Sequence, residues 1–582
     1  MFNLKFIWAK LKGKRNLFII GLILTVVTSF IGLVNPTLSK YLVDDIIKKQ
    51  NHSLLIPMVL LMLGVAVFKN LLHLSKVYFM EKASQHMLYN IRMTIFTNIQ
   101  YQEMNYFNHI TTGDIITRLN GDLEFIRHFV AYTSYSYVEM LFVFCGGLSI
   151  MFTTNVKMTL AFLSVMPFLV LVSYFYSRYI RPFFKKNREN LAQLNTCAQE
   201  NIEGNRVVKA FSREHYEIEK FSKHSKEYMD SQLKAAYAFQ KVLPLISLIA
   251  NLLTPITIFV GGYFVIKGEL SLGELTMFSS LSWTLTVPMQ NASNLLNDYQ
   301  RFAASVEKVI EINYDQPMIK DRDDSIKVND NLKGKIEFKD VCYSAENKQI
   351  LSNVSFIVEP GTTIGIMGPT GSGKTTIANL LSRFYDIDSG HILIDGIDIN
   401  KLKLEDIHRS IITATQDVFL FSDTIENNIA FSDSNMSRKS VIHAARLAAA
   451  DQFIKDTPDG YDTIIGERGV GLSGGQRQRL AFARAIAAHP AVLILDDTTS
   501  AVDAETEAYI RNSLKKLPFS CTKIIIAQRI SSVIDADQIV VIEDGKATVG
   551  NHSSLAKTNR FYRDVCELQD IENLPEFVGG EQ

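Results

Sequence analysis

Residues 368–376 read GPTGSGKTT and follow the apolar run TTIGIM at 362–367. These nine residues fit the pattern GxxxxGK[ST], and the stretch TTIANLLSRF, which begins at Thr375, has a helical composition. A strand, a glycine-rich loop and a helix in this order form a phosphate-binding loop: backbone N–H groups approach phosphate oxygens and the lysine reaches the outer phosphates. The Thr375 hydroxyl can ligate magnesium. We therefore expect ATP and Mg²⁺ as ligands, held by Gly368, Pro369, Thr370, Gly371, Ser372, Gly373, Lys374, Thr375 and Thr376.

Two further segments complete the expected nucleotide site. The apolar run VLILD at 492–496 ends in Asp496, a carboxylate that can hold the magnesium as a Walker B strand does. Between it and the phosphate loop lies LSGGQ at 472–476, which opens a helical stretch. The start of a helix binds phosphate, so the expected contacts there are Ser473, Gly474, Gly475 and Gln476.

The carboxyl-terminal half alternates short β-rich runs with helical stretches, which predicts an α/β domain over 335–565. A charged stretch without periodicity, 313–334, separates this domain from residues 1–312. The acidic end, 566–582, is expected to be a solvated tail.

The first 312 residues contain six apolar runs long enough to cross a bilayer, within a chain of 582 residues that is 47% hydrophobic and 21% charged. Buried helices of a soluble protein are the alternative, which the length of several runs makes improbable. The expected fold is an all-α domain of six transmembrane helices followed by an α/β P-loop domain. The runs lie at about 17–38, 54–72, 137–154, 158–176, 243–266 and 275–295.

Charge fixes the expected orientation. Lys10, Lys12, Lys14 and Arg15 precede the first run, which places the amino terminus and the nucleotide-binding half in the cytoplasm. Three lysines in the first outer loop run against this rule. Sixty basic against 60 acidic side chains give zero net charge and no attraction to nucleic acid, and the five scattered cysteines indicate no disulfide framework or zinc site.

Taken together, these motifs make residues 335–560 resemble the nucleotide-binding domain of an ABC transporter, and nearly the whole chain resembles an ABC exporter half-transporter. The resemblance places Gln416 as the Q-loop glutamine, in the catalytic and magnesium-binding set, with Glu467 and Asp503 in further family motifs. It also implies coupling helices in the polar segments 107–122 and 199–214, the second reaching the partner's nucleotide domain. A multi-pass protein of a bacterial plasma membrane, in contact with membrane lipid, is expected.

The sequence departs from the family pattern at two catalytic positions. Asp497 stands where the family has a glutamate that orients or deprotonates the attacking water, and Gln528 stands where it has a switch histidine. A carboxylate one methylene short predicts slow hydrolysis, because a misplacement of about 1 Å costs about a hundredfold in rate. We therefore expect a heterodimer whose second half-transporter keeps the glutamate and the histidine. Tolerated variation in an active enzyme is the alternative.

The adenine-stacking aromatic is ambiguous. The register counted from Val341 puts its place at Ala345, whereas distance to the phosphate loop favours Tyr343, which we choose.

The passenger is expected to be hydrophobic or amphiphilic, because the spans carry few ionisable residues. Glu139 is a candidate partner for a lipophilic cation, although it lies where a carboxylate can reach headgroups and water; Trp283, Gln290 and Asn291 are further candidates. Multidrug-type export is the leading hypothesis. A peptide or lipid exporter, and a regulatory subunit that binds ATP without driving transport, are the alternatives.

Overall fold

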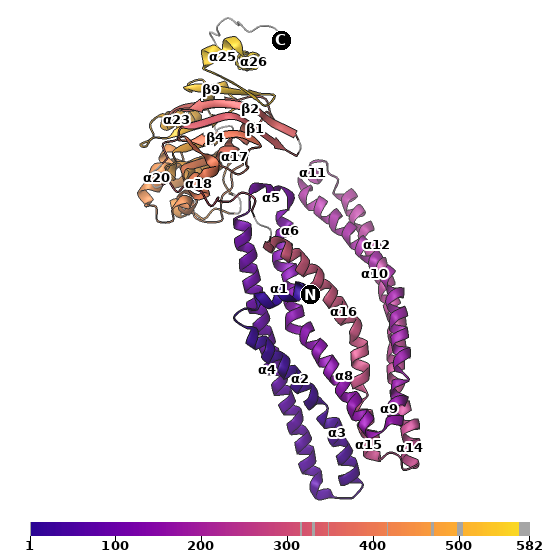
Figure 1. Ribbon diagram of the computed structural model, residues 1–582. Coiled ribbons are helices and arrows are strands. Elements are labelled where there is room, and N and C mark those ends of the chain that lie inside the picture. The colour runs from indigo at the N-terminus through magenta and orange to yellow at the C-terminus, as the bar shows by residue number, and fades with distance from the viewer. Residues whose placement is uncertain are drawn as a thin grey trace. The chain divides into compact units, whose positions relative to one another are not determined.

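The computed structural model describes residues 2–314, 317–328, 332–346, 348–415, 417–466, 469, 471–497 and 504–569. The chain divides into two compact units (Figure 1). The first comprises Met1–Gln100 and Thr112–Asp315, and the second comprises Tyr101–Thr111 and Gln316–Gln582. The short segment Tyr101–Thr111 therefore belongs with the nucleotide-binding half although the sequence places it between two membrane runs.

The first unit is entirely helical in its described residues. Its α-helices are α1 Phe2–Lys10, α2 Arg15–Gly32, α3 Val34–Tyr41, α4 Leu55–Gln100, α6 Thr112–Thr117, α7 Leu123–His128, α8 Ser134–Thr154, α9 Val156–Leu163, α10 Met166–Glu203, α11 Asn205–Ala210, α12 Glu214–Asn251, α13 Leu253–Ile256, α14 Gly262–Ile266, α15 Leu272–Leu281 and α16 Trp283–Tyr314. The π-helical segments η1 Leu42–Ile47, η3 Arg118–Asp122, η4 Phe129–Thr133 and η5 Thr257–Gly261 connect some of these helices.

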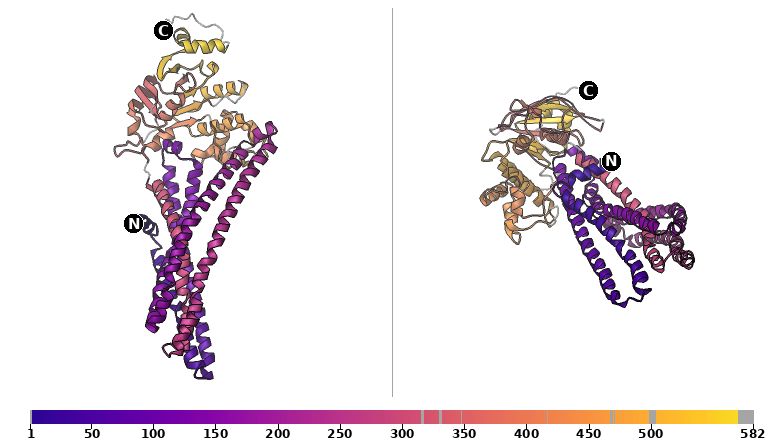
Figure 2. Two further views of the ribbon diagram at one scale, coloured as in Figure 1. Left: turned by 90° about the vertical axis from the view of Figure 1, so that its right-hand side faces the viewer. Right: turned by 60° about the horizontal axis from the view of Figure 1, so that its bottom comes forward.

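All six predicted apolar runs lie on helical segments. Within the described residues, three helical stretches are long and apolar enough to cross a bilayer: Arg15–Ile47, His52–Gln100 and Thr112–Thr154. Val156–Phe168 and Leu253–Ile266 are shorter apolar helices. Helices α4, α10 and α12 continue far beyond their apolar parts, and α10 and α12 run side by side (Figures 1 and 2).

Glycines let some of these helices approach closely. A Cβ at Gly21 of α2 would lie 2.4 Å from the sulfur of Met80 in α4, and one at Gly147 of α8 would lie 2.3 Å from the Thr284 hydroxyl of α16. Side chains larger than hydrogen at these positions would push the helices apart, so the two glycines fix the packing of the bundle.

Two of the three outer-loop lysines that run against the charge rule have acidic partners. Lys40 pairs with Glu274 at 3.0 Å, and Lys49 pairs with Asp45 at 2.6 Å. Asp44 accepts hydrogen bonds from the Ser271 hydroxyl and, at 2.9 Å, from the Gly273 N–H at the start of α15. A carboxylate is stabilised at a helix amino terminus, so Asp44 ties η1 to α15.

The second unit is an α/β domain with two sheets. Its strands are β1 Ile336–Ala345, β2 Lys348–Val358, β3 Thr363–Met367, β4 Ser389–Ile394, β5 Ile397–Asp398, β6 Ile411–Ala414, β7 Val492–Asp496, β8 Thr522–Ile526, β9 Gln538–Glu543 and β10 Lys546–Gly550. Its α-helices are α5 Met104–His109, α17 Lys374–Leu381, α18 Leu404–Ser410, α19 Ile425–Ile429, α20 Arg438–Leu447, α21 Asp451–Lys455, α22 Gly474–Ala487, α23 Ala504–Lys515, α24 Ile530–Val533, α25 His552–Thr558 and α26 Arg560–Leu568.

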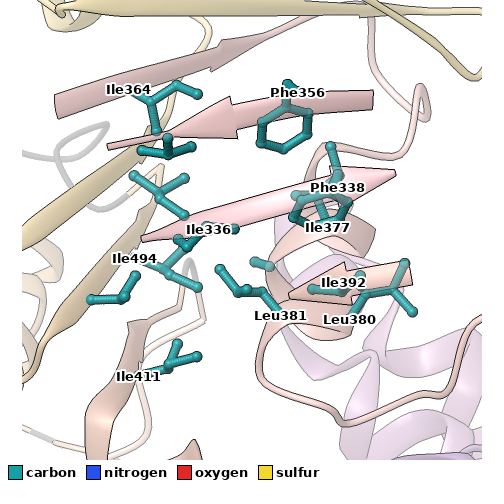
Figure 3. Packing of buried hydrophobic residues seen from close by; sticks show 14 of the residues in the cluster. Ile336, Phe338, Phe356, Ile364, Ile377, Leu380, Leu381, Ile392, Ile411 and Ile494 are labelled. Carbon is teal, nitrogen blue, oxygen red and sulfur yellow. The ribbon is translucent and has the colours of Figure 1, made fainter. Parts of the chain in front are cut away.

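The larger sheet has the strand order β10-β9-β3-β8-β7-β6, and all its neighbours except β10 pair in parallel. The smaller antiparallel sheet has the order β2-β1-β4-β5. Helix α17 lies between the two sheets: its Ile377, Leu380 and Leu381 join the buried cluster that also contains Phe338 and Phe356 (Figure 3). The rings of these two phenylalanines stack with centroids 4.5 Å apart.

The opposite face of the larger sheet carries different helices. Along β7, Val492 and Ile494 belong to the cluster around α17, whereas Leu493 and Leu495 belong to the cluster around α19, α20 and α22. Alternate residues of a strand face opposite sides. The helix that follows the phosphate loop and the helix that follows LSGGQ therefore pack on opposite faces of one sheet.

Helix α5 packs within this unit. Asn108 Nδ2 donates to the Tyr385 hydroxyl at 3.1 Å, and the Met318 N–H donates to the Glu103 carboxylate at 2.8 Å. The segment implied to be the first coupling helix thus contacts its own nucleotide-binding half.

Candidate nucleotide-binding site

The candidate site lies at the carboxyl ends of three neighbouring parallel strands, where open α/β sheets bind ligands. The phosphate loop follows β3, Gln528 follows β8, and Asp497 follows β7. The Ala527 N–H donates to the Ile366 carbonyl at 3.2 Å, and the Asp497 N–H donates to the Ile526 carbonyl at 2.9 Å. These bonds extend the ladders past the strands and bring all three segments together.

The phosphate loop requires glycine at its first position. Gly368 has a φ of 149°, and a Cβ there would lie 2.2 Å from the Ile542 carbonyl oxygen. Gly373, with a φ of 101°, stands in the left-handed region directly before α17. These conformations turn the chain from β3 into the amino terminus of α17, where backbone N–H groups can meet phosphate.

Lys374 folds over the loop it follows. Its Nζ donates to the carbonyl oxygens of Gly368 and Pro369, at 2.8 and 2.7 Å. Desolvation lowers the pKa of Lys374, and the nearby Asp496 and Asp497 carboxylates oppose that effect. The ammonium group is held beside the loop and can transfer its hydrogen bonds to phosphate oxygens.

Two observations show that the site fits a nucleotide with magnesium. The Ser372 hydroxyl oxygen is buried and has no hydrogen-bond partner among the described residues, so it can hydrogen-bond to a ligand in the loop. Thr375 hydrogen-bonds to the Asp496 carboxylate, which brings together the two expected magnesium ligands. Thr375 and Asp496 would hold Mg²⁺ when it is bound, and the ion would supply positive charge that offsets the charge of the phosphates.

Asp496, the last residue of β7, and Asp497, which follows it, both have raised pKa values. Asp496 is 6% exposed, and desolvation raises its pKa against the effects of Thr375 and Lys374. Burial and the charge of Asp496 also raise the pKa of Asp497, with Arg529 opposing. A raised pKa makes Asp497 a stronger proton acceptor, which suits the predicted role of a base even though its side chain is short.

The segment after β8 brings in residues that sequence reasoning missed. Gln528 is exposed, and the neighbouring Arg529 guanidinium lies 3.5 Å from the Glu507 carboxylate. The Ser532 hydroxyl donates to Glu507 at 2.6 Å. Glu507 is 8% exposed. Arg529 directly follows Gln528 in the sequence and could have been noticed there. No local signal marks Glu507, which precedes Arg529 by 22 positions.

The LSGGQ segment forms a capping box at the start of α22. The Gln476 N–H donates to Ser473 Oγ at 3.2 Å, and the Ser473 N–H donates to Gln476 Oε1 at 2.8 Å. The Ser473 hydroxyl accepts one bond and keeps its own proton to donate. Helix α22, which begins at LSGGQ, and helix α17, which begins at the phosphate loop, lie on opposite faces of the sheet.

Tyr343 lies beside the phosphate loop but packs inward. It pairs with Leu351 across the β1–β2 hairpin, and a Cβ on Gly373 would lie 2.9 Å from Leu351. The ring is half-buried against the cluster around α17, with its centroid 6.0 Å from that of Tyr385. Ala345 ends the strand near the hairpin turn. Adenine stacking by Tyr343 remains a prediction.

Gln416, Glu467 and Asp503 lie outside the described residues. The segment after Gln416 is held by Arg484 of α22, whose guanidinium donates to the Phe419 carbonyl at 3.0 Å and to the Asn428 carbonyl at 2.8 Å.

The membrane candidates are distributed differently. Glu139 is paired within the chain: Lys76 Nζ lies 2.8 Å from its carboxylate and 4.3 Å from the centroid of the Tyr135 ring. Trp283 is half-buried at the start of α16, and Gln290 and Asn291 of the same helix are exposed. Glu139 was expected to reach headgroups and water, but the structure pairs it with Lys76. A substrate role for these four residues remains a prediction.

Comparison with known proteins identifies the family to which this architecture belongs. Residues 18–289 match the family described as the ABC transporter transmembrane region, and residues 351–500 match the family described as ABC transporter. The chain is 35% identical to the uncharacterized ABC transporter ATP-binding protein YknU of Bacillus subtilis, over 97% of this chain and 98% of that protein. The chain belongs to the ABC transporter family.

Other relatives carry more specific names. The putative multidrug export ATP-binding/permease protein YgaD of Bacillus subtilis is 33% identical over 96% of this chain and 97% of that protein. The ATP-dependent lipid A-core flippase of Haemophilus influenzae is 32% identical over 91% of each chain. A solved bacterial Atm1-family ABC exporter with ATP bound shares the fold, with a TM-score of 0.80 and 24% identity over 96% of this chain and 99% of that one.

These matches confirm the predicted fold, a helical transmembrane domain followed by an α/β nucleotide-binding domain, and identify an ABC exporter half-transporter with an ATPase domain coupled to transport. The predicted domain limits remain predictions, except that the limit at 565 falls inside α26 and buried Cys566 lies in the domain core instead of a solvated tail.

Proposed function

We propose that this chain is one half of a heterodimeric exporter of hydrophobic or amphiphilic compounds, and that the site on its own Walker motifs hydrolyses ATP slowly. The observation that carries the proposal is the pair of Asp497 and Gln528 at the ends of adjacent strands. Asp497 follows β7 in a left-handed conformation, with a φ of 49°, and its N–H is bonded to the Ile526 carbonyl at 2.9 Å. This bond restrains the main chain, so a backbone shift is not expected to supply the reach that the side chain lacks.

The arrangement of the sheet supports a site that is shared with a second chain. A nucleotide on the phosphate loop of this chain is completed by the LSGGQ of a partner, because this chain's own LSGGQ leads into the opposite face. Its intact Ser473–Gln476 segment would in turn complete the site of a partner that carries the glutamate and the histidine. That second site would do most of the hydrolysis.

The tip formed around α11 supports docking on another chain. Ile202, Val207 and Phe211 are 77%, 61% and 73% exposed, although they are apolar and lie at the polar end of the α10–α12 pair. This tip would carry movement of a partner's nucleotide domain to the spans, with both nucleotide domains in the cytoplasm of a bacterial cell.

The rate of ATP hydrolysis distinguishes this chain alone from the heterodimer. The chain is purified from its native membrane with an affinity tag, the co-purifying half-transporter is identified, and ATPase activity is measured for this chain alone and for the co-expressed pair. The pair is expected to be at least tenfold faster, with the difference abolished by replacing the partner's catalytic glutamate. Equal turnover per site by this chain alone would overturn the heterodimer.

The class of transported compound is tested in inverted vesicles with a fluorescent cationic dye and a fluorescent phospholipid. Dye movement supports multidrug-type export. Lipid movement without dye movement would favour the second candidate, a lipid exporter, which the 32% identity to a lipid A-core flippase supports. Dye transport that survives Lys374→Ala in this chain would indicate a regulatory or structural subunit.

A further inference from the structure

The side chain of Gln569, at the carboxyl-terminal end of α26, bridges the backbone on either side of Arg529. Its Nε2 donates to the Gln528 carbonyl at 3.0 Å, and its Oε1 accepts from the Ile530 N–H at 2.8 Å. One amide group thus satisfies one acceptor and one donor of the segment that carries the residue in the switch-histidine place. The amide group of a glutamine side chain offers both functions in one plane.

The rest of α26 is anchored so that this bridge is held in place. Tyr562 and Cys566 are fully buried in a cluster that includes Ile530 of α24 and Met367, the last residue before the phosphate loop. The Tyr562 hydroxyl also lies 2.9 Å from Nδ1 of His552 in α25. The α25–α26 pair therefore packs against the bases of both the phosphate loop and the Gln528 segment.

The Gln528 segment is also tied to α23, where Glu507 contacts Arg529 and Ser532. Glu507 acts on side chains, whereas Gln569 acts on the backbone of Gln528 itself. Fixing the carbonyl of a residue restricts the direction in which its side chain leaves the chain.

We propose that Gln569 is a positioning residue for ATP hydrolysis: it fixes the backbone at Gln528 so that the Gln528 side chain meets the terminal phosphate of ATP on the phosphate loop. This inference rests on the proposed function, since it takes Gln528 as a group that contacts the nucleotide. It assigns a task to the end of α26, beyond the predicted domain limit.

The test uses the full-length chain in lipid nanodiscs, in the assembly isolated from the native membrane. Gln569→Ala removes both hydrogen bonds, and Gln569→Glu keeps the acceptor for Ile530 but loses the donor to Gln528. Glu567→Gln is the matched control, because among the described residues Glu567 pairs with Arg563 on the same helix, at 2.9 Å. Two measurements are made. The first is hydrogen exchange of the peptide covering 527–534, and the second is ATP hydrolysis (kcat and KM) in an assembly whose partner has its catalytic glutamate replaced, so that the remaining turnover comes from the site that carries Gln528.

We expect Gln569→Ala to speed exchange of the Ile530 amide, and Gln569→Glu to speed it less. Loss of the bridge should lower kcat about fivefold, as for one or two net hydrogen bonds, with KM within twofold. In a Gln528→Ala background the same substitution should lower kcat no further. Glu567→Gln should change neither quantity.

Unchanged exchange at 527–534 in Gln569→Ala would overturn the bridge, whatever the ATPase activity. Faster exchange combined with a loss of kcat that is fully additive to that of Gln528→Ala would overturn the positioning role, because the two residues would then act independently. If the assembly binds ATP without hydrolysing it, the proposed function fails, and the exchange measurement still decides on the bridge.

Discussion

The ion pair between Lys76 and Glu139 permits a quantitative test of the membrane domain. The Lys76 side chain is completely buried, and its ammonium lies 2.8 Å from a Glu139 carboxylate that is 36% exposed. Glu139→Gln leaves the ammonium buried without a counter-charge. Removing one partner of a buried pair costs about 3–5 kcal/mol. Because Glu139 is partly solvated and the Tyr135 ring still contacts Lys76, we expect about 3 kcal/mol, at the lower end of that range.

The assay is thermal unfolding in nanodiscs, followed by tryptophan fluorescence. A loss of this size should lower Tm by about 5–10 °C. The double variant Lys76→Met/Glu139→Leu should regain most of the loss, because an apolar pair of similar volume replaces a buried ion pair at little cost. The control is Glu269→Gln, which breaks the exposed Lys157–Glu269 pair of 2.7 Å and should shift Tm by less than about 2 °C. Equal shifts for Glu139→Gln and Glu269→Gln, or no recovery in the double variant, would refute the reasoning.

Three further predictions concern the nucleotide site. Asp497→Glu should raise the ATPase rate of the purified chain at least about tenfold without changing ATP affinity, and an unchanged rate would show that reach is not limiting. The raised pKa of Asp497 means that the folded state holds its proton more tightly than the unfolded state, so its contribution to stability is present at low pH and is lost as pH rises through the folded pKa. Asp497→Asn should therefore raise the Tm of the nucleotide-free protein more at pH 8 than at pH 5. A larger rise at pH 5 would contradict a raised pKa of Asp497 in the folded state. Gly368→Ala should abolish binding of a fluorescent ATP analogue, whereas Gly396→Ala, with a φ of 81° and open space around it, should lower Tm and leave binding intact.

The parts of the site that the sequence predicted are those carried by contiguous patterns. The phosphate loop follows a strand and begins a helix, Asp496 ends an apolar run, and LSGGQ opens α22. Each of these motifs can be recognised from about a dozen consecutive residues. The shortened carboxylate at Asp497 is visible for the same reason. Its left-handed backbone is not, because a φ of 49° depends on the hydrogen bond to Ile526 across the sheet.

Contacts between distant segments could not be predicted. Lys76 lies beyond the predicted end of the second span, and nothing in the sequence shows that α4 continues to Gln100 and brings this lysine to Glu139, 63 residues away. Gln569 bonds to backbone atoms, which every residue carries, so no pattern marks its partner. The apolar run 54–72 at the start of α4 was predicted from hydrophobicity, whereas the exposed apolar residues of the α11 tip lie in a segment, 199–214, that the sequence marked only as polar.

The bond between Asp44 and the start of α15 constrains how the outer end can move. Lys40 and Asp44 both lie within eight residues of the turn after the first span, and both are joined to the first turn of α15. Helices α3 and α15 must then travel as a single rigid body when the transporter changes state. Spin labels on these two helices should keep a constant separation through an ATP cycle, even while their separations from other helices change.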